Sequence, residues 1–157
     1  MKRYWMSGIG LVAVAVLATV GRYQSADAHC QVPCGIYDDP ARINGMLEDQ
    51  ATIEKAMNEI NEASGKHDAL AQNQLARWVN TKEQHASNII TVVSEYFLTQ
   101  KLKDVPADDA DYDAYLEKLA VHHRVLRAAM KTKQTVDVAN AAALKKSIEA
   151  LGRLYAE

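Results

Sequence analysis

Cysteine, glycine, proline and aromatic residues are all scarce in this 157-residue chain. Two cysteines are too few to hold a fold together, which excludes a disulfide-rich scaffold. Seven glycines and three prolines are few for the many tight turns of a β-sandwich, so the composition favours helices. An excess of charge is also lacking, because 18 Lys and Arg against 20 Asp and Glu give a net charge of −2. That balance excludes the strongly basic surface of a nucleic-acid-binding protein.

A long hydrophobic run occurs only near the N-terminus. Met6 to Val20 contains no charged residue, two basic residues precede it, and Ala26-Asp27-Ala28 resembles a signal-peptidase cleavage site. The pattern predicts a leader over residues 1–28, which is removed, and a single domain over residues 29–157. A retained membrane anchor is the alternative, but the run is shorter than the roughly 20 apolar residues that span a bilayer. We therefore expect an exported protein, periplasmic or extracellular, that is free of the membrane once the leader is gone.

The first half of the mature chain shows apolar residues at helical spacing in two segments. The first is predicted to run from Asp39-Pro40 to Ser64-Gly65, with Asp39 as its N-cap and the proline as its first helical residue. The second is predicted over about residues 68–103. This second helix is longer than usual, so we expect a kink in its polar middle, residues 82–88.

Two further helices are predicted in the second half of the chain. The third follows Asp108 and Asp109, either of which is a candidate cap, and the fourth carries apolar residues from Val136 to Tyr155. No segment shows the alternation of a β-strand. Four amphipathic helices with short connections predict an all-α, up-down-up-down four-helix bundle.

Both cysteines lie in the short segment 29–37, His-Cys-Gln-Val-Pro-Cys-Gly-Ile-Tyr, which separates the leader from the first helix. After cleavage His29 would offer a free α-amine and an imidazole, and Cys30 and Cys34 would offer two thiolates. The amine, the Cys30 backbone amide and its thiolate can form adjacent chelate rings on one metal. A turn before the first helix can bring Cys34 back to complete a planar N2S2 set, which favours Ni(II) or Cu(II).

Other uses of this segment are open on spacing alone. Two nearby cysteines in an exported protein commonly form a disulfide, here between Cys30 and Cys34. Zinc is less suited, since only three side-chain donors lie close together, and attachment of a c-type haem requires a C-x-x-C-H motif that is absent. The alternative to an enzyme is therefore an exported helical metal-binding module, or a disulfide-stapled bundle, without catalysis.

The pattern His29-Cys30-x-x-Pro33-Cys34-Gly35-x-Tyr37 resembles the N-terminal nickel-binding hook of nickel-containing superoxide dismutases. The resemblance implies a four-helix bundle, assembled as a homohexamer, whose leader is removed before nickel binds. It implies that His29 supplies its amine and an axial imidazole, Cys30 its amide nitrogen and thiolate, and Cys34 the second thiolate. The implied reaction is disproportionation of superoxide to dioxygen and hydrogen peroxide, with nickel cycling between Ni(II) and Ni(III).

The same resemblance assigns two tyrosines. Tyr37 matches the family tyrosine that stands over the open face of the metal and restricts access to it. Tyr96, in Ser94-Glu95-Tyr96-Phe97, resembles a second family tyrosine, and we expect it to join Tyr37 near the site. Simple packing of Tyr96 in the core, with its hydroxyl at the surface, is the alternative.

Residues that orient the imidazole are harder to place. The family uses an acidic residue early in the first helix and a basic partner, for which Asn44 or Glu48, and His85 in place of an arginine, are the candidates. His67 is not expected to be a ligand, because it follows the end of the first helix and should be solvated. The adjacent pair His122-His123 is not expected to bind a metal together, because neighbours on a helix point about 100° apart. Removing the leader takes away three basic residues and one acidic residue, so the net charge becomes −4. Any attraction for anionic superoxide must therefore be local.

Overall fold

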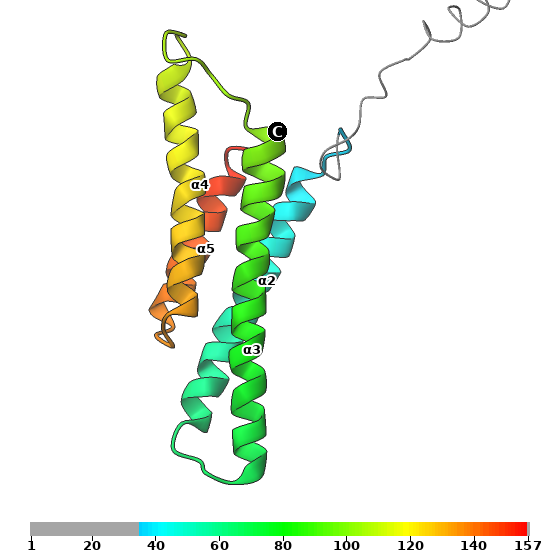
Figure 1. Cartoon of the computed structure of the whole chain (residues 1–157), viewed down its shortest axis with the longest axis vertical. Helices are drawn as coiled ribbons and strands as arrows, with labels where there is room; N and C mark the ends of the chain where they lie inside the picture. Colours follow the sequence, from blue (N-terminus) through cyan, green and yellow to red (C-terminus); the bar gives the residue numbers. More distant parts are fainter. Residues whose placement is uncertain (1–34, 157) are drawn as a thin grey trace, which may run out of the picture. The chain divides into compact units, whose positions relative to one another are not determined.

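The computed structural model describes residues 35–156, and the predicted leader lies outside them. Helix α2 contacts α3 and α5, and α4 contacts the same two helices, so that the helices close into a ring around one core (Figure 1). This arrangement confirms the predicted all-α four-helix bundle. The elements are α2 Asp39–Ala63, α3 Ala69–Thr91 with its continuation η1 Val92–Lys101, α4 Tyr112–Lys133 and α5 Ala139–Gly152.

Helix α2 is capped by a different aspartate from the one predicted. The N-cap is Asp38, whose Oδ1 accepts a hydrogen bond from the Ala41 backbone N–H at 2.9 Å, so the prediction of Asp39 as the cap is wrong. Asp39 is instead the first helical residue and Pro40 the second, where a missing N–H leaves no helical hydrogen bond unmade. The carboxylate of Asp39 is thereby left available for contacts with other helices.

The predicted second helix is confirmed in extent, but its irregularity lies elsewhere than expected. Residues 82–88 are regular α-helix, whereas Val92–Lys101 is π-helical. The Leu102 N–H donates to the carbonyl of Phe97, five residues earlier, at 2.8 Å. Two polar side chains, Thr99 and Gln100, also donate to carbonyls five residues before them. These bonds favour the wider turn. The polar middle of α3 keeps α-helical hydrogen bonding, and its side chains contact both neighbours: Lys82 the end of α4, and His85 and Asn88 the carboxylate of Asp49 in α2.

Helix α4 starts later than predicted. It begins at Tyr112, and a cap by Asp108 or Asp109 is wrong. Asp109 closes the preceding turn: its carbonyl accepts from the Tyr112 N–H at 3.2 Å, and its carboxylate accepts from the Asp111 N–H at 2.9 Å. The side chain of this aspartate is therefore used inside the loop and not on the helix end.

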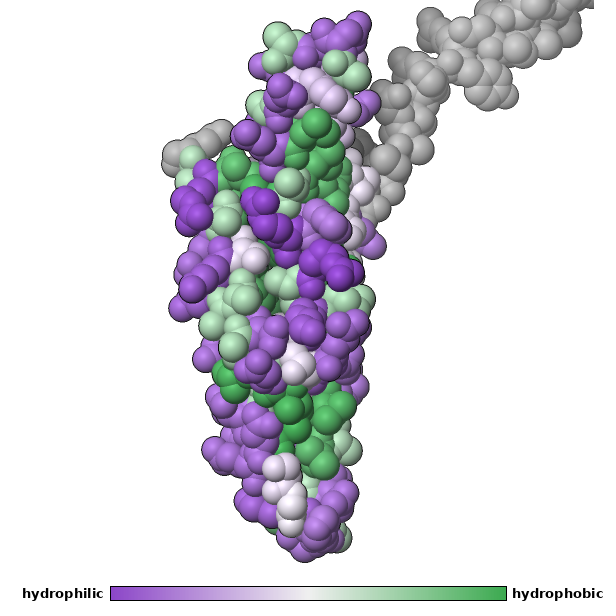
Figure 2. Space-filling view, turned by 90° about the vertical axis from the view of Figure 1, so that its left-hand side faces the viewer, coloured by the Kyte–Doolittle hydropathy of each residue, from purple (hydrophilic) through white to green (hydrophobic). Residues whose placement is uncertain are grey.

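The core consists of the apolar stripes of the helices. Figure 2 shows that hydrophilic residues cover most of one outer face of the molecule, with separate apolar areas between them. None of the helices over residues 35–156 is both long and apolar enough to cross a membrane. The largest apolar side chains that are fully buried are Phe97, Met46, Ile53, Met57, Ile89, Leu144, Ile148, Leu151, Val93 and Val125.

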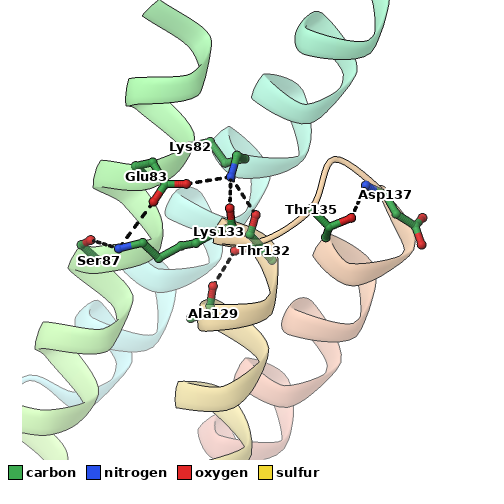
Figure 3. Close-up of polar contacts among 8 residues, drawn as sticks. All are labelled: Lys82, Glu83, Ser87, Ala129, Thr132, Lys133, Thr135 and Asp137. Carbon is green, nitrogen blue, oxygen red and sulfur yellow. Dashed lines mark hydrogen bonds and ion pairs between the residues drawn. The ribbon is translucent and has the colours of Figure 1, made fainter. Parts of the chain in front are cut away.

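A buried lysine joins α3 to the end of α4. The ammonium group of Lys82 donates to the backbone carbonyls of Thr132 at 3.0 Å and Lys133 at 2.8 Å, and it pairs with Glu83 at 2.8 Å (Figure 3). The last carbonyls of a helix have no partner within the helix and carry partial negative charge. Lys82 therefore satisfies these acceptors and compensates that charge at the same time.

A histidine and a tyrosine form a second buried polar contact. His122 is fully buried, and its Nδ1 lies 2.7 Å from the carbonyl of Lys118, which can only accept. Nδ1 therefore carries the proton, and Nε2 accepts the hydroxyl proton of Tyr155 at 2.9 Å. Burial lowers the pKa of His122; burial, and to a smaller extent the charge of Asp39, raise the pKa of Tyr155 to about 12.

This histidine predicts an acid-sensitive fold. Because the pKa of His122 is below 6.5 in the folded state, the unfolded chain binds a proton below that pH that the folded chain does not. The free energy of unfolding should therefore decrease as the pH falls from 7 to 5. Urea unfolding of metal-free protein measures it, because loss of a bound metal in acid would add its own pH dependence. The variant His122→Gln should show a smaller decrease over this interval, and an unchanged one would contradict the assignment.

Candidate metal centre

The predicted nickel ligands His29, Cys30 and Cys34 lie outside the described residues, and the described part of the site begins directly after them. Gly35 has a φ of +77°, a left-handed conformation that glycine adopts without strain. The chain then runs without helix or strand through Tyr37 into α2. The structure therefore shows a turn residue immediately after the second cysteine, where the sequence predicted the chain to bend.

The structure brings the two predicted site tyrosines together. The ring centroids of Tyr37 and Tyr96 are 5.7 Å apart and the ring planes meet at 86°, an edge-to-face contact. Tyr37 comes from the segment before α2 and is 38% exposed, whereas Tyr96 comes from η1 and is 4% exposed. The hydroxyl of Tyr96 is not at the surface, as simple core packing would place it, but donates to the Asp39 carboxylate at 2.6 Å.

Asp39 links these tyrosines to a lysine. Its Oδ1 accepts the hydroxyl of Tyr96, and its Oδ2 pairs with the Lys101 ammonium group at 2.9 Å. Burial, followed by the hydrogen bond and charge of Asp39, raises the pKa of Tyr96 far above its usual value of 10.0. The Tyr96 phenol consequently keeps its proton to a higher pH than an ordinary tyrosine, and that proton is directed to the carboxylate.

Two cations lie over the faces of the tyrosine rings. The Lys101 ammonium is 4.6 Å from the centroid of Tyr37, and the Arg42 guanidinium carbon is 5.2 Å from that of Tyr96. Both distances are within the range of cation–π attraction. Within the described residues the pair of phenols thus has the carboxylate of Asp39 and two cations beside it, and Asp38 immediately precedes Asp39 in the chain.

Sequence reasoning did not find Asp39, Arg42 or Lys101 as site residues. The sequence indicates Asp39 only as a helix cap, and Lys101 lies 62 positions farther along the chain than this aspartate. The sequence feature that could have indicated these residues is a carboxylate in the first turn of one helix combined with a tyrosine near the end of the next helix. It does not specify which side chains meet, because that depends on the helical register near Tyr96.

The residues considered for orienting the imidazole have different surroundings. Asn44 and Glu48 are exposed, and neither side chain makes a hydrogen bond or ion pair within residues 35–156. His85 instead pairs with a different acid, Asp49, at 2.6 Å, and the same carboxylate accepts from the Asn88 side chain at 2.6 Å. A role of Asn44, Glu48 or His85 toward His29 stays a prediction.

The remaining histidines occupy unrelated positions. His67 is exposed, and of the adjacent pair His122 is buried while His123 is exposed, so the two rings point to different sides of α4. In the described part of the chain no three His, Cys, Asp or Glu side chains are grouped so that they could hold a metal ion. Both cysteines of the protein precede this part.

Fold and site together define an all-α bundle with a tyrosine pair next to a cysteine-containing N-terminal segment. A family model for nickel-containing superoxide dismutases matches residues 24–157, which includes that segment and all the helices of the described part of the chain. The chain belongs to this family. It is an oxidoreductase that acts on superoxide with nickel as its cofactor. No curated protein and no solved structure matches the sequence significantly.

Proposed function

We propose that the nickel of this dismutase is bound at the mature N-terminus by His29, Cys30 and Cys34, after removal of residues 1–28. The chemistry of the donor set supports this assignment. An α-amine with a pKa near 8 and two thiols release their protons to a metal at modest cost, and a planar N2S2 set suits Ni(II). The described residues fit the same location, because Gly35 turns the chain directly after Cys34.

The reaction needs two superoxide ions and two protons for each dioxygen and hydrogen peroxide formed. The chemistry that nickel supplies is a one-electron couple between Ni(II) and Ni(III). In our proposal Tyr37, three residues after Cys34, presents its half-exposed phenol to the substrate and restricts access to the site. Within residues 35–156 its hydroxyl makes no hydrogen bond, and in the proposal it donates to an oxygen anion. Tyr96 packs edge-to-face against the ring of Tyr37, and its own hydroxyl donates to the carboxylate of Asp39.

Export and assembly belong to the same proposal. The predicted leader supports export to the periplasm or the outside, and the resemblance of the hook to that of the family supports a homohexamer. The N-terminal residue of the purified protein tests the first point, with His29 expected. Light scattering of the nickel-loaded protein tests the second.

Protein that begins at His29 should bind about one nickel per chain and dismutate superoxide. Cys34→Ser should lower the activity by about a hundredfold or more, since a thiolate donor is lost. His67→Gln is the matched control, because this exposed side chain lies outside the proposed donor set and should leave both values unchanged. Metal analysis and a superoxide-consumption assay provide the measurements. The ligand set is wrong if nickel fails to bind while both cysteines stay reduced, or if Cys34→Ser retains full activity.

A further inference from the structure

The π-helical turn of η1 places two residues on one carboxylate that an α-helix would separate. Tyr96 and Lys101 are five positions apart, which in an α-helix is a rotation of about 140°. In a π-helical turn the hydrogen bonds join residues five apart, so such residues lie nearly above one another. Both side chains reach Asp39, at 2.6 Å and 2.9 Å. The unusual turn is therefore what allows one aspartate to hold both residues.

Lys101 connects this arrangement to the segment that follows the proposed ligands. Its ammonium group lies 4.6 Å from the ring centroid of Tyr37 while it pairs with Asp39. Tyr37 belongs to a stretch without helix or strand, so contacts of its ring, and not a backbone ladder, must fix it. The ring contacts of Tyr37 within the described residues are with Tyr96 and Lys101, both from η1.

We propose that Asp39 and Lys101 are positioning residues for the tyrosine pair: the carboxylate fixes Tyr96 and the lysine, and the lysine fixes Tyr37 at the base of the hook. The proposal rests on the placement of nickel next to Tyr37 proposed above. Lys101 also keeps a positive charge beside the exposed phenol. The mature chain has a net negative charge, so such a local cation favours the approach of an anion that the protein as a whole repels.

Partial burial makes the contact between Asp39 and Lys101 effective. The aspartate side chain is 15% exposed and that of the lysine 24%, so water screens the ion pair less than a pair at the open surface. Loss of the lysine leaves the carboxylate with Tyr96 alone and removes the cation from the face of Tyr37. The ring of Tyr37 should then sample other positions, because its remaining ring contact is one edge-to-face neighbour.

Lys101→Met tests this, with Lys101→Arg as the conservative variant. Lys103→Met is the matched control, because within residues 35–156 the Lys103 ammonium donates to the carbonyl of Gln100 and has no cation–π contact with either tyrosine. NMR of ring-labelled tyrosine follows Tyr37, whose signal is assigned from its loss in Tyr37→Phe. The Tyr37 signal should move toward the position of an exposed tyrosine in Lys101→Met, stay in place in Lys103→Met and return in Lys101→Arg.

Activity provides the second measurement on the same proteins. At equal nickel content, kcat/KM should fall about threefold to tenfold in Lys101→Met, and its dependence on ionic strength should weaken. An unmoved Tyr37 signal, or equal effects of Lys101→Met and Lys103→Met, would overturn the proposal, as would a loss of nickel in Lys101→Met. The NMR comparison is repeated without nickel, so that it tests the position of Tyr37 independently of the metal. Failure of the ligand assignment is recognised separately, because wild-type protein would then bind no nickel.

Discussion

A protein that carries one extra residue before His29 is expected to lose superoxide dismutation almost completely. In the extended chain the nitrogen of His29 is a backbone amide and no longer an amine. The α-amine, which gives up its proton to nickel at modest cost, is therefore lost as a donor. The chelate rings through Cys30 lose their first member. Activity should fall by roughly a hundredfold or more, and nickel bound per chain should fall with it. Metal analysis and the superoxide assay measure both quantities.

Two matched proteins control for the length of the chain. An extension placed after Glu157 should leave activity unchanged. An N-terminal extension that a specific protease removes, so that His29 becomes the first residue, should be inactive before cleavage and active after it. Full activity of the uncleaved protein would show that the amine of His29 is not a ligand.

Replacement of Lys82 by methionine is expected to lower the free energy of unfolding by about 2–4 kcal/mol. The lysine side chain is 5% exposed, and its ammonium group donates to the carbonyls of Thr132 and Lys133 (Figure 3). Methionine fills a similar volume but leaves both acceptors without a donor at the buried end of α4. The loss therefore exceeds that of a surface ion pair. Urea unfolding followed by circular dichroism measures the change.

Glu83→Gln separates the backbone contacts of Lys82 from its ion pair. The carboxylate of Glu83 is 37% exposed, so removing its charge should cost less than about 1 kcal/mol. If Lys82→Met were no more destabilising than Glu83→Gln, the hydrogen bonds to the end of α4 would not be the reason for burying this lysine.

Much of the fold could be predicted because its determinants are local in the sequence. Apolar residues at helical spacing indicate each helix, and two consecutive turn residues, Ser64 and Gly65, end the first one. The candidate metal ligands could also be predicted from local sequence. His29, Cys30 and Cys34 are close together in the chain, and chelation by neighbouring residues needs no long-range folding. The helix caps were less predictable, because Asp38 and Asp39 are equivalent by type and only backbone geometry distinguishes them.

The helical class, the family and the nickel chemistry depend on residue types at short spacing and can therefore be inferred from the sequence. Which charged groups surround the tyrosines depends on how the helices pack. Asp39 contacts Lys101 because the start of α2 lies beside η1, and because the π-helical turn places the lysine on the same side of η1 as Tyr96. The His122–Tyr155 pair likewise joins α4 to the end of the chain. Such contacts depend on the register and rotation of each helix. The hydrophobic periodicity of a sequence predicts which face of a helix is buried, but not which single residues meet across two helices.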